Sequence, residues 1–461
     1  MPRPSQVTPS LLALQLQSRG VVSAQVLADS LKVDRSTVSR NLTALGNRVV
    51  RIGAARRARY ALRRQVRTAG MRWPLYRIDE TGRAHEWAML QALHGGFFLE
   101  ANGGGPAWFA RGYAGGVFPG LPLFLSDVRP QGFIGRALAQ AAGATLGVPV
   151  DPRNWQDDDI LVYLLEQGDD GPGDFVVGEK MMERVLRRQV AVEGEAIADG
   201  ERAGRYTGQA LQAMQGGVPE SSAGGEQPKF TAAVRNDAGG IRHVLVKFSP
   251  AGESPASRRW ADLLAAEAHA LEVAARQGVA AAQAGVLDAG GRRFLEVTRF
   301  DRSGAAGRRG VISLQAVEAG LLDETASDWN AMARAMETAG LFSAADAADL
   351  RRRWCFGQLI GNTDMHLGNA AVWFGVDEPF SLAPLYDMLP MLFAPGPQGE
   401  LVSREFSPPP PLPAVREEWH AVVPWALAFW QQVQADMRIS PEFRGLAGQA
   451  GETVEAMARR F

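Results

Sequence analysis

The sequence is poor in cysteine and in long apolar runs. Its 461 residues contain one cysteine, Cys355, which excludes an intramolecular disulfide and any zinc site built from several cysteines. No uninterrupted apolar stretch reaches about 18 residues, the length at which a membrane-spanning helix is considered. The apolar run over residues 11–14 is followed by Gln15 and Gln17 and is too short for the core of a signal peptide. We therefore predict a cytoplasmic protein without a membrane association.

Acidic residues are scarce at the N-terminus. Residues 1–70 contain 13 lysines and arginines but two acids, Asp29 and Asp34, which gives a formal charge of +11. The other 391 residues carry 36 basic and 48 acidic side chains, or −12, so the net charge of the chain is −1. This asymmetry predicts a small basic module, suited to nucleic acid, joined to a larger acidic body. The length is sufficient for about two to four domains.

Residues 8–46 have the pattern of three short helices, and the third, over residues 35–45, is polar and basic on its outer side. Residues 48–52 and 56–62 predict the two strands of a wing. We therefore predict a winged helix-turn-helix domain over residues 1–68 that binds DNA, although solvated arginines on a small helical cap would give the same pattern. The predicted DNA contacts are Arg35, Ser36, Thr37, Ser39, Arg40, Arg56 and Arg57.

Two carboxylates and an amide mark the most informative part of the sequence. Asp364 and Asn369 lie five residues apart within residues 361–369, and Asp387 follows 18 residues later. In kinases, a first aspartate accepts the proton of the attacking hydroxyl, while an asparagine and a second aspartate hold Mg²⁺ against the nucleotide phosphates. Because asparagine, aspartate and glycine also favour turns, the spacing alone fits a polar loop equally well.

A lysine in an apolar strand supplies a second part of such a site. Lys247 follows three apolar residues, and a glycine-rich segment over residues 221–229 precedes its strand. A glycine loop over the phosphates and a strand lysine at the α- and β-phosphates belong to a kinase nucleotide site. Glu267, in the middle of the amphipathic helix predicted over residues 257–277, stands where a kinase places the partner of that lysine. With 51 glycines in the chain, the glycines alone indicate little.

Five motifs follow one another along the chain, at residues 221–229, 246–248, 299–302, 361–369 and 386–387. In their sequence and order they resemble the motifs of the HipA family of toxin serine/threonine kinases. The N-terminal domain looks like that of the YjjJ-type branch of the family, and the resemblance covers about residues 73–440. It implies a two-lobed, distantly kinase-like fold that uses ATP and Mg²⁺ to phosphorylate proteins, in some members aminoacyl-tRNA synthetases. Family members typically pair with a separate DNA-binding antitoxin.

Carried over position by position, the resemblance assigns roles to single residues. It implies that Asp364 is the catalytic base and that His366 structures the catalytic loop rather than acting as a second base. Asn369 and Asp387 would hold Mg²⁺. The autophosphorylation candidates are Ser221 and Ser222. The residues implied in nucleotide binding are Ser222, Ala223, Gly224, Gly225, Glu226, Gln227, Lys247, Thr298, Arg299 and Phe300, the last three around the adenine.

The whole sequence predicts an α+β protein in three parts. The first part is the winged helix-turn-helix domain over residues 1–68, and a basic hinge over residues 63–70 joins it to the rest of the chain. A strand-rich kinase lobe follows over residues 69–300, and a mainly helical kinase lobe over residues 301–461 carries the catalytic loop.

The predicted function is a serine/threonine protein kinase of toxin type with a fused DNA-binding domain that would let it regulate its own transcription. Its predicted partners are DNA, a protein substrate such as an aminoacyl-tRNA synthetase or another translation factor, and a second copy of the chain, because helix-turn-helix proteins commonly bind half-sites as dimers. The alternative is a transcription regulator whose non-catalytic kinase fold senses nucleotide, but such a module has no need of Asp364. Metal-dependent action on DNA is a third hypothesis, and it does not require Lys247.

Overall fold

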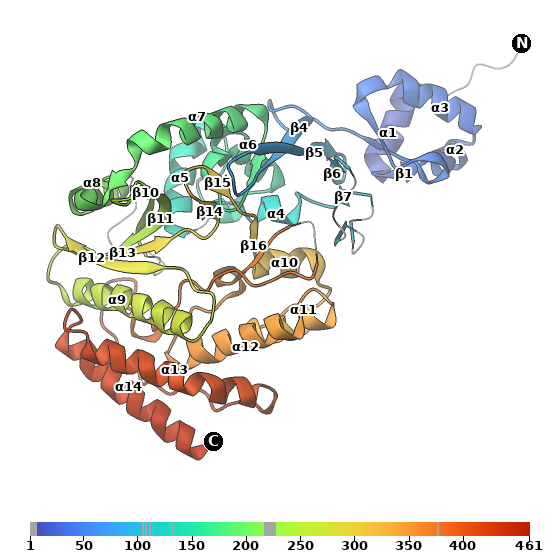
Figure 1. Ribbon diagram of the computed structural model, residues 1–461. Coiled ribbons are helices and arrows are strands. Elements are labelled where there is room, and N and C mark those ends of the chain that lie inside the picture. Colours follow the sequence, from blue (N-terminus) through green and yellow to red (C-terminus); the bar gives the residue numbers. More distant parts are fainter. Residues whose placement is uncertain are drawn as a thin grey trace, which may run out of the picture.

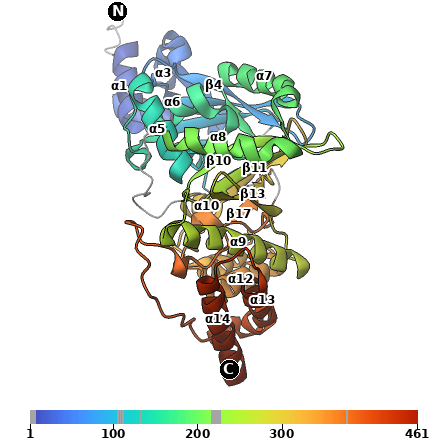
Figure 2. The same cartoon turned by 90° about the vertical axis from the view of Figure 1, so that its left-hand side faces the viewer.

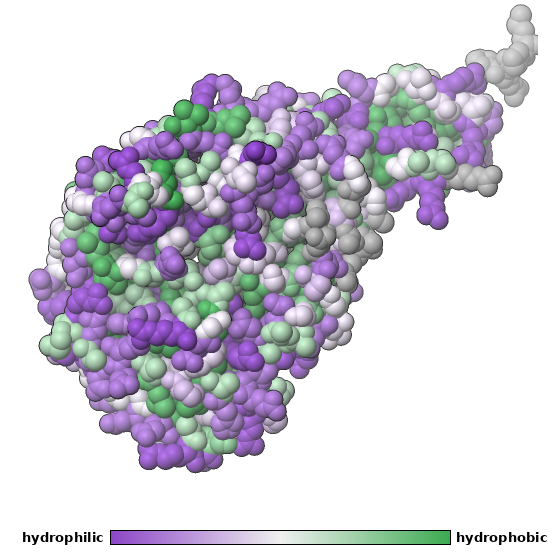
Figure 3. Space-filling view, in the orientation of Figure 1, coloured by the Kyte–Doolittle hydropathy of each residue, from purple (hydrophilic) through white to green (hydrophobic). Residues whose placement is uncertain are grey.

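The computed structural model describes residues 7–103, 106, 108–109, 112–113, 115–130, 132–215, 227–375 and 378–461. Helices and strands form the predicted α+β fold, in which a small N-terminal domain lies to one side of a larger body (Figure 1). Among the described helices, none has the length and apolar content needed to span a membrane. Hydrophilic and hydrophobic residues are interspersed over the face seen in Figure 3.

The N-terminal domain consists of helices and a small antiparallel sheet. Its elements are α1 (Pro9–Arg19), β1 (Val22–Ser23), α2 (Ala24–Leu31), α3 (Arg35–Ala44), β2 (Val49–Ile52) and β3 (Arg59–Leu62), with strand order β1-β3-β2. Each helix begins with a capping residue whose side-chain oxygen accepts a hydrogen bond from a backbone N–H of the first turn. The capping residues are Thr8, Ser23 and Asp34 respectively. Leu16 and Val38 are fully buried between the helices. The three predicted helices and both predicted strands are therefore present.

The predicted contact of Thr37 with DNA is wrong. Thr37 is 5% exposed, and its hydroxyl oxygen accepts a hydrogen bond from Arg40 Nη2 at 3.2 Å. Because Asp34 caps the N–H of Thr37 at 2.7 Å, the first turn of α3 places this side chain inward, next to Val38. The remaining predicted contacts on α3, Arg35, Ser36, Ser39 and Arg40, are exposed, as is Arg57, whereas the side chain of Arg56 lies outside the described residues.

The predicted hinge over residues 63–70 is an interface. Arg64 donates two hydrogen bonds to Asp158, at 2.6 and 2.7 Å, and Arg67 pairs with Asp159. An apolar cluster crosses the same junction and contains Val50, Ile52, Ala61, Leu93 and Phe98. These contacts fix the N-terminal domain against the following part of the chain.

That following part, the middle domain, is built on a five-stranded sheet. The strands β4 (Arg72–Ile78), β5 (Ala84–Leu93), β6 (Gly96–Ala101), β7 (Val117–Phe118) and β8 (Phe175–Val177) lie in the order β7-β6-β5-β4-β8. The helices α4 (Leu123–Ser126), α5 (Gly132–Leu146), α6 (Asp157–Gln167) and α7 (Glu179–Glu195) accompany it. Leu75, Leu90 and Leu99, one on each central strand, are buried in its core.

A second five-stranded sheet follows, so the range 69–300 contains two sheets. Its strands β9 (Ile197–Ala198), β10 (Lys229–Arg235), β11 (Ile241–Phe248), β12 (Ala284–Ala289) and β13 (Arg292–Thr298) lie in the order β12-β13-β11-β10-β9. The helices of this region are α8 (Arg202–Gln215) and α9 (Pro255–Arg276). Figure 2 shows the sheet between α8 on one side and α9 on the other.

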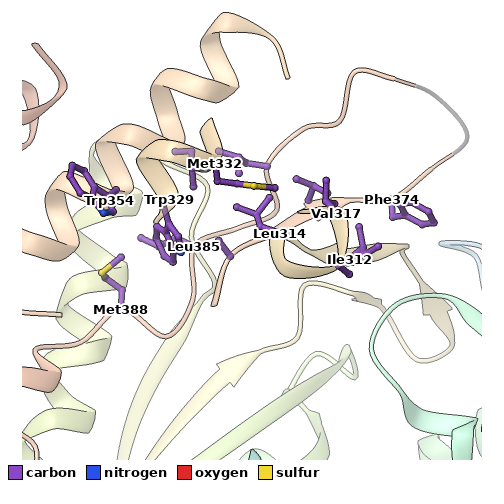
Figure 4. Packing of buried hydrophobic residues seen from close by; sticks show 14 of the residues in the cluster. Ile312, Leu314, Val317, Trp329, Met332, Trp354, Phe374, Leu385 and Met388 are labelled. Carbon is purple, nitrogen blue, oxygen red and sulfur yellow. The ribbon is translucent and has the colours of Figure 1, made fainter. Parts of the chain in front are cut away.

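The C-terminal part is mainly helical, as predicted. It contains β14 (Arg302–Ser303), β15 (Gly307–Arg308), β16 (Val311–Ser313), α10 (Leu314–Leu321), α11 (Trp329–Thr338), α12 (Ala344–Leu359), β17 (Ala371–Trp373), α13 (Arg416–Ala435) and α14 (Pro441–Arg460). One core packs Leu314, Trp329 and Trp354 against Leu385 and Met388 (Figure 4). Because Leu385 and Met388 flank Asp387, this core supports the segment that carries the second predicted aspartate.

Candidate kinase site

A buried ion pair joins the second sheet to the long helix beside it. Lys247 Nζ, on β11, donates to both carboxylate oxygens of Glu267, on α9, at 2.6 and 2.8 Å. The two residues are 4% and 0% exposed. Burial opposes the charge on Lys247, but Asp387 and Glu267 together raise the pKa of its ammonium above the ordinary value. The pairing predicted for Glu267 is therefore confirmed.

Asp387 meets the same ammonium from the C-terminal part of the chain. Its Oδ1 accepts a hydrogen bond from Lys247 Nζ at 2.5 Å. Burial would raise the pKa of Asp387, but Lys247 and Lys229 lower it to about 2. The backbone of Asp387 has φ of +51°, a left-handed conformation that costs a non-glycine residue about 1–2 kcal/mol. The surrounding packing thus holds an ionised carboxylate in a strained position, where it can bind a cation.

Asn362 connects the two aspartate-bearing segments. Its Oδ1 accepts the N–H of Asp364 at 3.0 Å, and its Nδ2 donates to the carbonyl of Asp387 at 3.3 Å. Asn369 closes the same loop, because its Nδ2 donates to the carbonyl of Asp364 at 2.8 Å. No role was predicted for Asn362, although its place two residues before an aspartate N–H is typical of an Asx turn.

Asp364 is open to solvent, with a side chain that is 54% exposed. The pKa of Asp364 lies above its ordinary value, mainly because the side chain is partly buried. A protonated His366 lowers this pKa, and the negative charge of Asp387 raises it. His366 Nε2 is 4.0 Å from Asp364 Oδ1, whereas His366 Nδ1 accepts the N–H of Gly368 at 3.1 Å. The contact with Gly368 lies within the loop that His366 is predicted to structure.

Lys229 is a further cation at this site, and no role was predicted for it. Lys229 and Lys247 are directly opposite each other in the antiparallel pair β10–β11, so they project from the same face of the sheet. Like charges in this position repel unless anionic groups lie between them. The sequence did contain a signal for a role of Lys229, because this lysine directly follows the glycine-rich segment and begins the strand that pairs with the strand of Lys247.

Of the phosphate loop predicted over residues 221–229, the structure describes residues 227–229. Gln227 Nε2 donates to the carbonyl of Phe248 at 2.6 Å, which fixes the end of the loop beside Lys247. The other predicted loop residues lie outside the described residues. These are Ser221, Ser222, Ala223, Gly224, Gly225 and Glu226, including both autophosphorylation candidates.

The side chain of Arg299, which was predicted to line the adenine site, is engaged in ion pairs. The guanidinium of Arg299 is held in ion pairs with Asp301 and Asp170, at 2.9 and 3.1 Å. Its backbone N–H donates to the carbonyl of His243 at 2.9 Å, so that donor is also in use. A buried arginine needs such anionic partners, so its guanidinium donors are used within the protein.

Thr298 and Phe300 are placed differently from each other. The N–H of Thr298 donates to the carbonyl of Gln283 at 2.8 Å and is not available to a base. The ring of Phe300 lies 5.6 Å from the ring of Tyr386, whose hydroxyl donates to the carbonyl of Gly368. Phe300 therefore lies beside both the catalytic loop and the Asp387 segment, where an aromatic face is useful to a nucleotide base.

The side chains of Asn369 and Asp387 fit a magnesium ion that is bound together with a nucleotide. Asn369 uses its Nδ2 within the loop, which leaves its Oδ1 as an acceptor. Mg²⁺ prefers oxygen ligands and is usually held by one or two carboxylates plus substrate phosphates. Among the described residues, no group of three or more His, Cys, Asp and Glu side chains could hold a metal by itself. Two protein ligands therefore suit Mg²⁺ only when phosphates supply the others.

The site combines four charged residues: a strand lysine, the helix glutamate that is paired with it, a loop aspartate and a second aspartate. Protein kinases use this arrangement for nucleotides. A family profile described as "YjjJ-like toxin, middle domain" matches residues 69–186, and one described as "HipA-like C-terminal domain" matches residues 221–457. Over 445 residues, 96% of this chain and 97% of the relative, the sequence is 36% identical to Toxin YjjJ of Escherichia coli strain K12. The chain therefore belongs to the family of YjjJ-like toxins, with a HipA-like C-terminal domain.

Two solved structures are similar at a lower level. HipA of Shewanella oneidensis MR-1, in a complex with HipB and its operator DNA, matches with a TM-score of 0.44 and 15% identity over 74% of this chain and 85% of that chain. The proinflammatory kinase CtkA of Helicobacter pylori matches with a TM-score of 0.35 and 10% identity over 50% of this chain and 93% of that chain. At these values neither structure bears on the function of this chain, and the family assignment rests on sequence.

Proposed function

We propose that this protein is an ATP- and Mg²⁺-dependent serine/threonine protein kinase with a DNA-binding domain at its N-terminus. The observation that carries the proposal is the contact of the buried Lys247 with both Glu267 and Asp387. Lys247 and Glu267 are buried, and Asp387 is partly buried, with a side chain that is 26% exposed. Removing an ion from water costs several kcal/mol, so the buried pair has a substantial desolvation cost. Protein kinases use this set to place the nucleotide phosphates.

On nucleotide binding, Lys247 would exchange its contact with Asp387 for the phosphates and keep its contact with Glu267. Lys229 on the neighbouring strand adds a second positive charge near the same phosphates. Asp387 and Asn369 would then hold Mg²⁺, which supplies neutralisation of phosphate charge. The catalytic contribution of these residues is therefore positioning and electrostatic stabilisation rather than covalent chemistry.

Asp364 acts on the attacking hydroxyl. Its exposed carboxylate accepts the proton of a serine or threonine hydroxyl while that oxygen bonds to the γ-phosphorus, and the bond to the β-phosphate oxygen breaks to release ADP. The raised pKa of Asp364 makes it a better base than an ordinary aspartate. Asn362 and Asn369 hold its backbone, so the carboxylate meets the hydroxyl in a fixed orientation.

The proposed substrate is a cytoplasmic protein of translation, such as an aminoacyl-tRNA synthetase, in keeping with the membership of a toxin family. Ser221 and Ser222 in the phosphate loop are the proposed sites of self-phosphorylation. A kinase whose phosphate loop carries its own acceptor hydroxyl would be inactivated by modification there.

We also propose that the N-terminal domain is a winged helix-turn-helix domain that binds DNA as a dimer. The support comes from Arg35, Ser36, Ser39 and Arg40, which are exposed along α3, and from the charge of +11 on residues 1–70. An exposed helix with basic and short hydroxyl side chains suits phosphates and base edges in a major groove.

Phosphoproteomics of a host-cell lysate tests the proposed kinase. The lysate is treated with phosphatase, cleared of it and incubated with Mg²⁺-ATP and either the wild-type protein or Asp364→Asn. We expect new phosphoserine or phosphothreonine sites in one or a few proteins with the wild type alone. ATP binding without new sites would favour the nucleotide-sensing regulator, and the same sites with both proteins would contradict the role of Asp364.

A further inference from the structure

Helix α10 lies between the middle domain and the catalytic loop and contacts both. From these contacts we propose that Asp127, in the middle domain, is a positioning residue for the catalytic loop, acting through Ser313 and α10. The inference rests on the proposed kinase function and extends the site into a domain that contributes no residue to the nucleotide contacts described above.

Asp127, which directly follows α4, caps α10 across the boundary between the two domains. Its Oδ2 accepts the N–H of Ser313 at 2.7 Å, and its Oδ1 accepts the hydroxyl of Ser313 at 2.5 Å. The hydroxyl oxygen of Ser313 accepts the N–H of Ala316 in the first turn of α10 at 3.2 Å. One carboxylate thus fixes both the backbone and the side chain of a residue 186 positions away.

The other end of α10 is held by the same domain. The hydroxyl of Tyr113 donates to the carbonyl of Gly320 at 2.5 Å. Leu123, the first residue of α4, packs so closely that a Cβ atom on Gly320 would lie 2.5 Å from its Cδ2. The middle domain therefore contacts both ends of α10, and a short helix held at both ends has little freedom to shift.

On its other side, α10 is bonded to the end of the catalytic loop. The N–H of Leu314 donates to the carbonyl of Ala370, at 2.8 Å, and Ser313 is paired with Ala371 between β16 and β17. Ala370 directly follows Asn369, the predicted magnesium ligand. Gln315 also approaches the loop, since a Cβ atom on Gly368 would lie 3.3 Å from its Oε1. A displacement at Ser313 would therefore move Asn369 and, through the Asn369 hydrogen bond to its carbonyl, Asp364.

The effect of this support is expected in turnover rather than in ATP binding. Lys247 and Glu267 lie on β11 and α9, which receive no contact from Asp127 in the described hydrogen bonds. The base Asp364 and the ligand Asn369, by contrast, are connected to Asp127 by the hydrogen bonds through Ser313, Leu314 and Ala370. Misplacement of reacting groups by about 1 Å can lower a rate by about 100-fold.

Steady-state kinetics of Asp127→Asn, Ser313→Ala and the double variant test the proposal. We expect each single variant to lower kcat at least about tenfold, with the KM for ATP changed by less than about threefold. Because both residues act through one contact, the double variant is expected to match the slower single variant rather than to combine both losses. Ser313→Thr keeps the hydroxyl and is expected to retain most of the wild-type rate.

The matched control is Asp151→Asn. Asp151 also caps a turn in the middle domain, by accepting the N–H of Arg153 at 2.9 Å, but it is not in contact with α10. Its kcat is expected to equal that of the wild type. A hydrogen-exchange measurement on the catalytic loop adds a readout that is independent of turnover, and Asp127→Asn is expected to speed exchange over residues 361–373.

The outcomes separate the two proposals. If the wild type neither binds ATP nor transfers phosphate, the kinase function fails. If the wild type is active but Asp127→Asn and Ser313→Ala keep its kcat and its exchange pattern, the positioning role is overturned. A double variant whose losses multiply would also overturn it, because independent losses exclude action through a shared contact.

Discussion

Glu267 accepts two hydrogen bonds from the ammonium of Lys247, at 2.6 and 2.8 Å, and the two residues are almost entirely buried. One partner lies on the second sheet and the other on α9, so the pair joins two elements as well as orienting the lysine. Asp387 is the second carboxylate on the same ammonium.

Replacement of Glu267 by alanine is expected to destabilise the protein strongly. Loss of one partner from a buried ion pair leaves an uncompensated charge and costs about 3–5 kcal/mol, and Asp387 can offset part of this cost. The change is measured as a shift in the urea midpoint. The control is Glu183→Ala, which removes an exposed ion pair with Arg187 and is expected to cost less than about 1 kcal/mol. Similar shifts for both variants would contradict the burial argument.

Asn362→Ala is expected to lower kcat by about 100-fold while ATP binding persists. Asn362 is the residue that ties the N–H of Asp364 to the carbonyl of Asp387, and its loss frees the two aspartates to move apart. Calorimetry with ATP and single-turnover phosphotransfer separate the two effects. Thr363→Ala changes an exposed neighbour in the same loop and is expected to leave both measurements near the wild type.

The acid limb of the pH profile is expected to shift when His366 is replaced by asparagine. Partial burial raises the pKa of Asp364, and a protonated His366 lowers it. Removal of that positive charge leaves the pKa of Asp364 higher, and because the base must be ionised, kcat falls at a higher pH than in the wild type. Asparagine keeps an acceptor for the N–H of Gly368, so the loop is preserved.

The profile of kcat against pH gives the test, with His420→Asn on the exposed face of α13 as control. The control is expected to superimpose on the wild type. A shift of the His366→Asn profile to lower pH would show that His366 does not act on Asp364 through its charge.

Arg35→Ala together with Arg40→Ala is expected to weaken binding to duplex DNA. Each lost phosphate contact reduces the magnitude of the slope of log affinity against log salt by about 1. We therefore expect the slope of the double variant to be smaller in magnitude than that of the wild type by about 2. Fluorescence anisotropy over a salt series measures this slope. A control with the same change of charge, Arg153→Ala with Arg187→Ala, alters exposed arginines of the middle domain and is expected to keep it.

The grouping of the candidate site residues was predictable because the motifs that contain them are local. Asp364, Asn369 and Asp387 sit in short motifs with fixed spacing, and Glu267 occupies a helical position that faces a strand lysine. The three N-terminal helices were predictable from their caps and apolar spacing.

The contacts that the sequence did not reveal depend on partners that are distant in sequence or on the exact phase of a helix. Arg299 is drawn into ion pairs that include Asp170, 129 positions away, and Asp127 meets Ser313 across 186 positions. Thr37 differs from its exposed neighbours by one position on α3, where the cap by Asp34 turns it inward. No periodicity in the sequence signals such contacts.

Intact-mass analysis after incubation with Mg²⁺-ATP tests the kinase assignment most directly. The wild-type protein and Asp364→Asn are treated side by side, and any modified residue is mapped by peptide analysis. We expect the mass of an added phosphate on the wild type alone, at Ser221 or Ser222. A wild-type protein that binds no ATP and gains no phosphate, even with host lysate present, would contradict the kinase assignment.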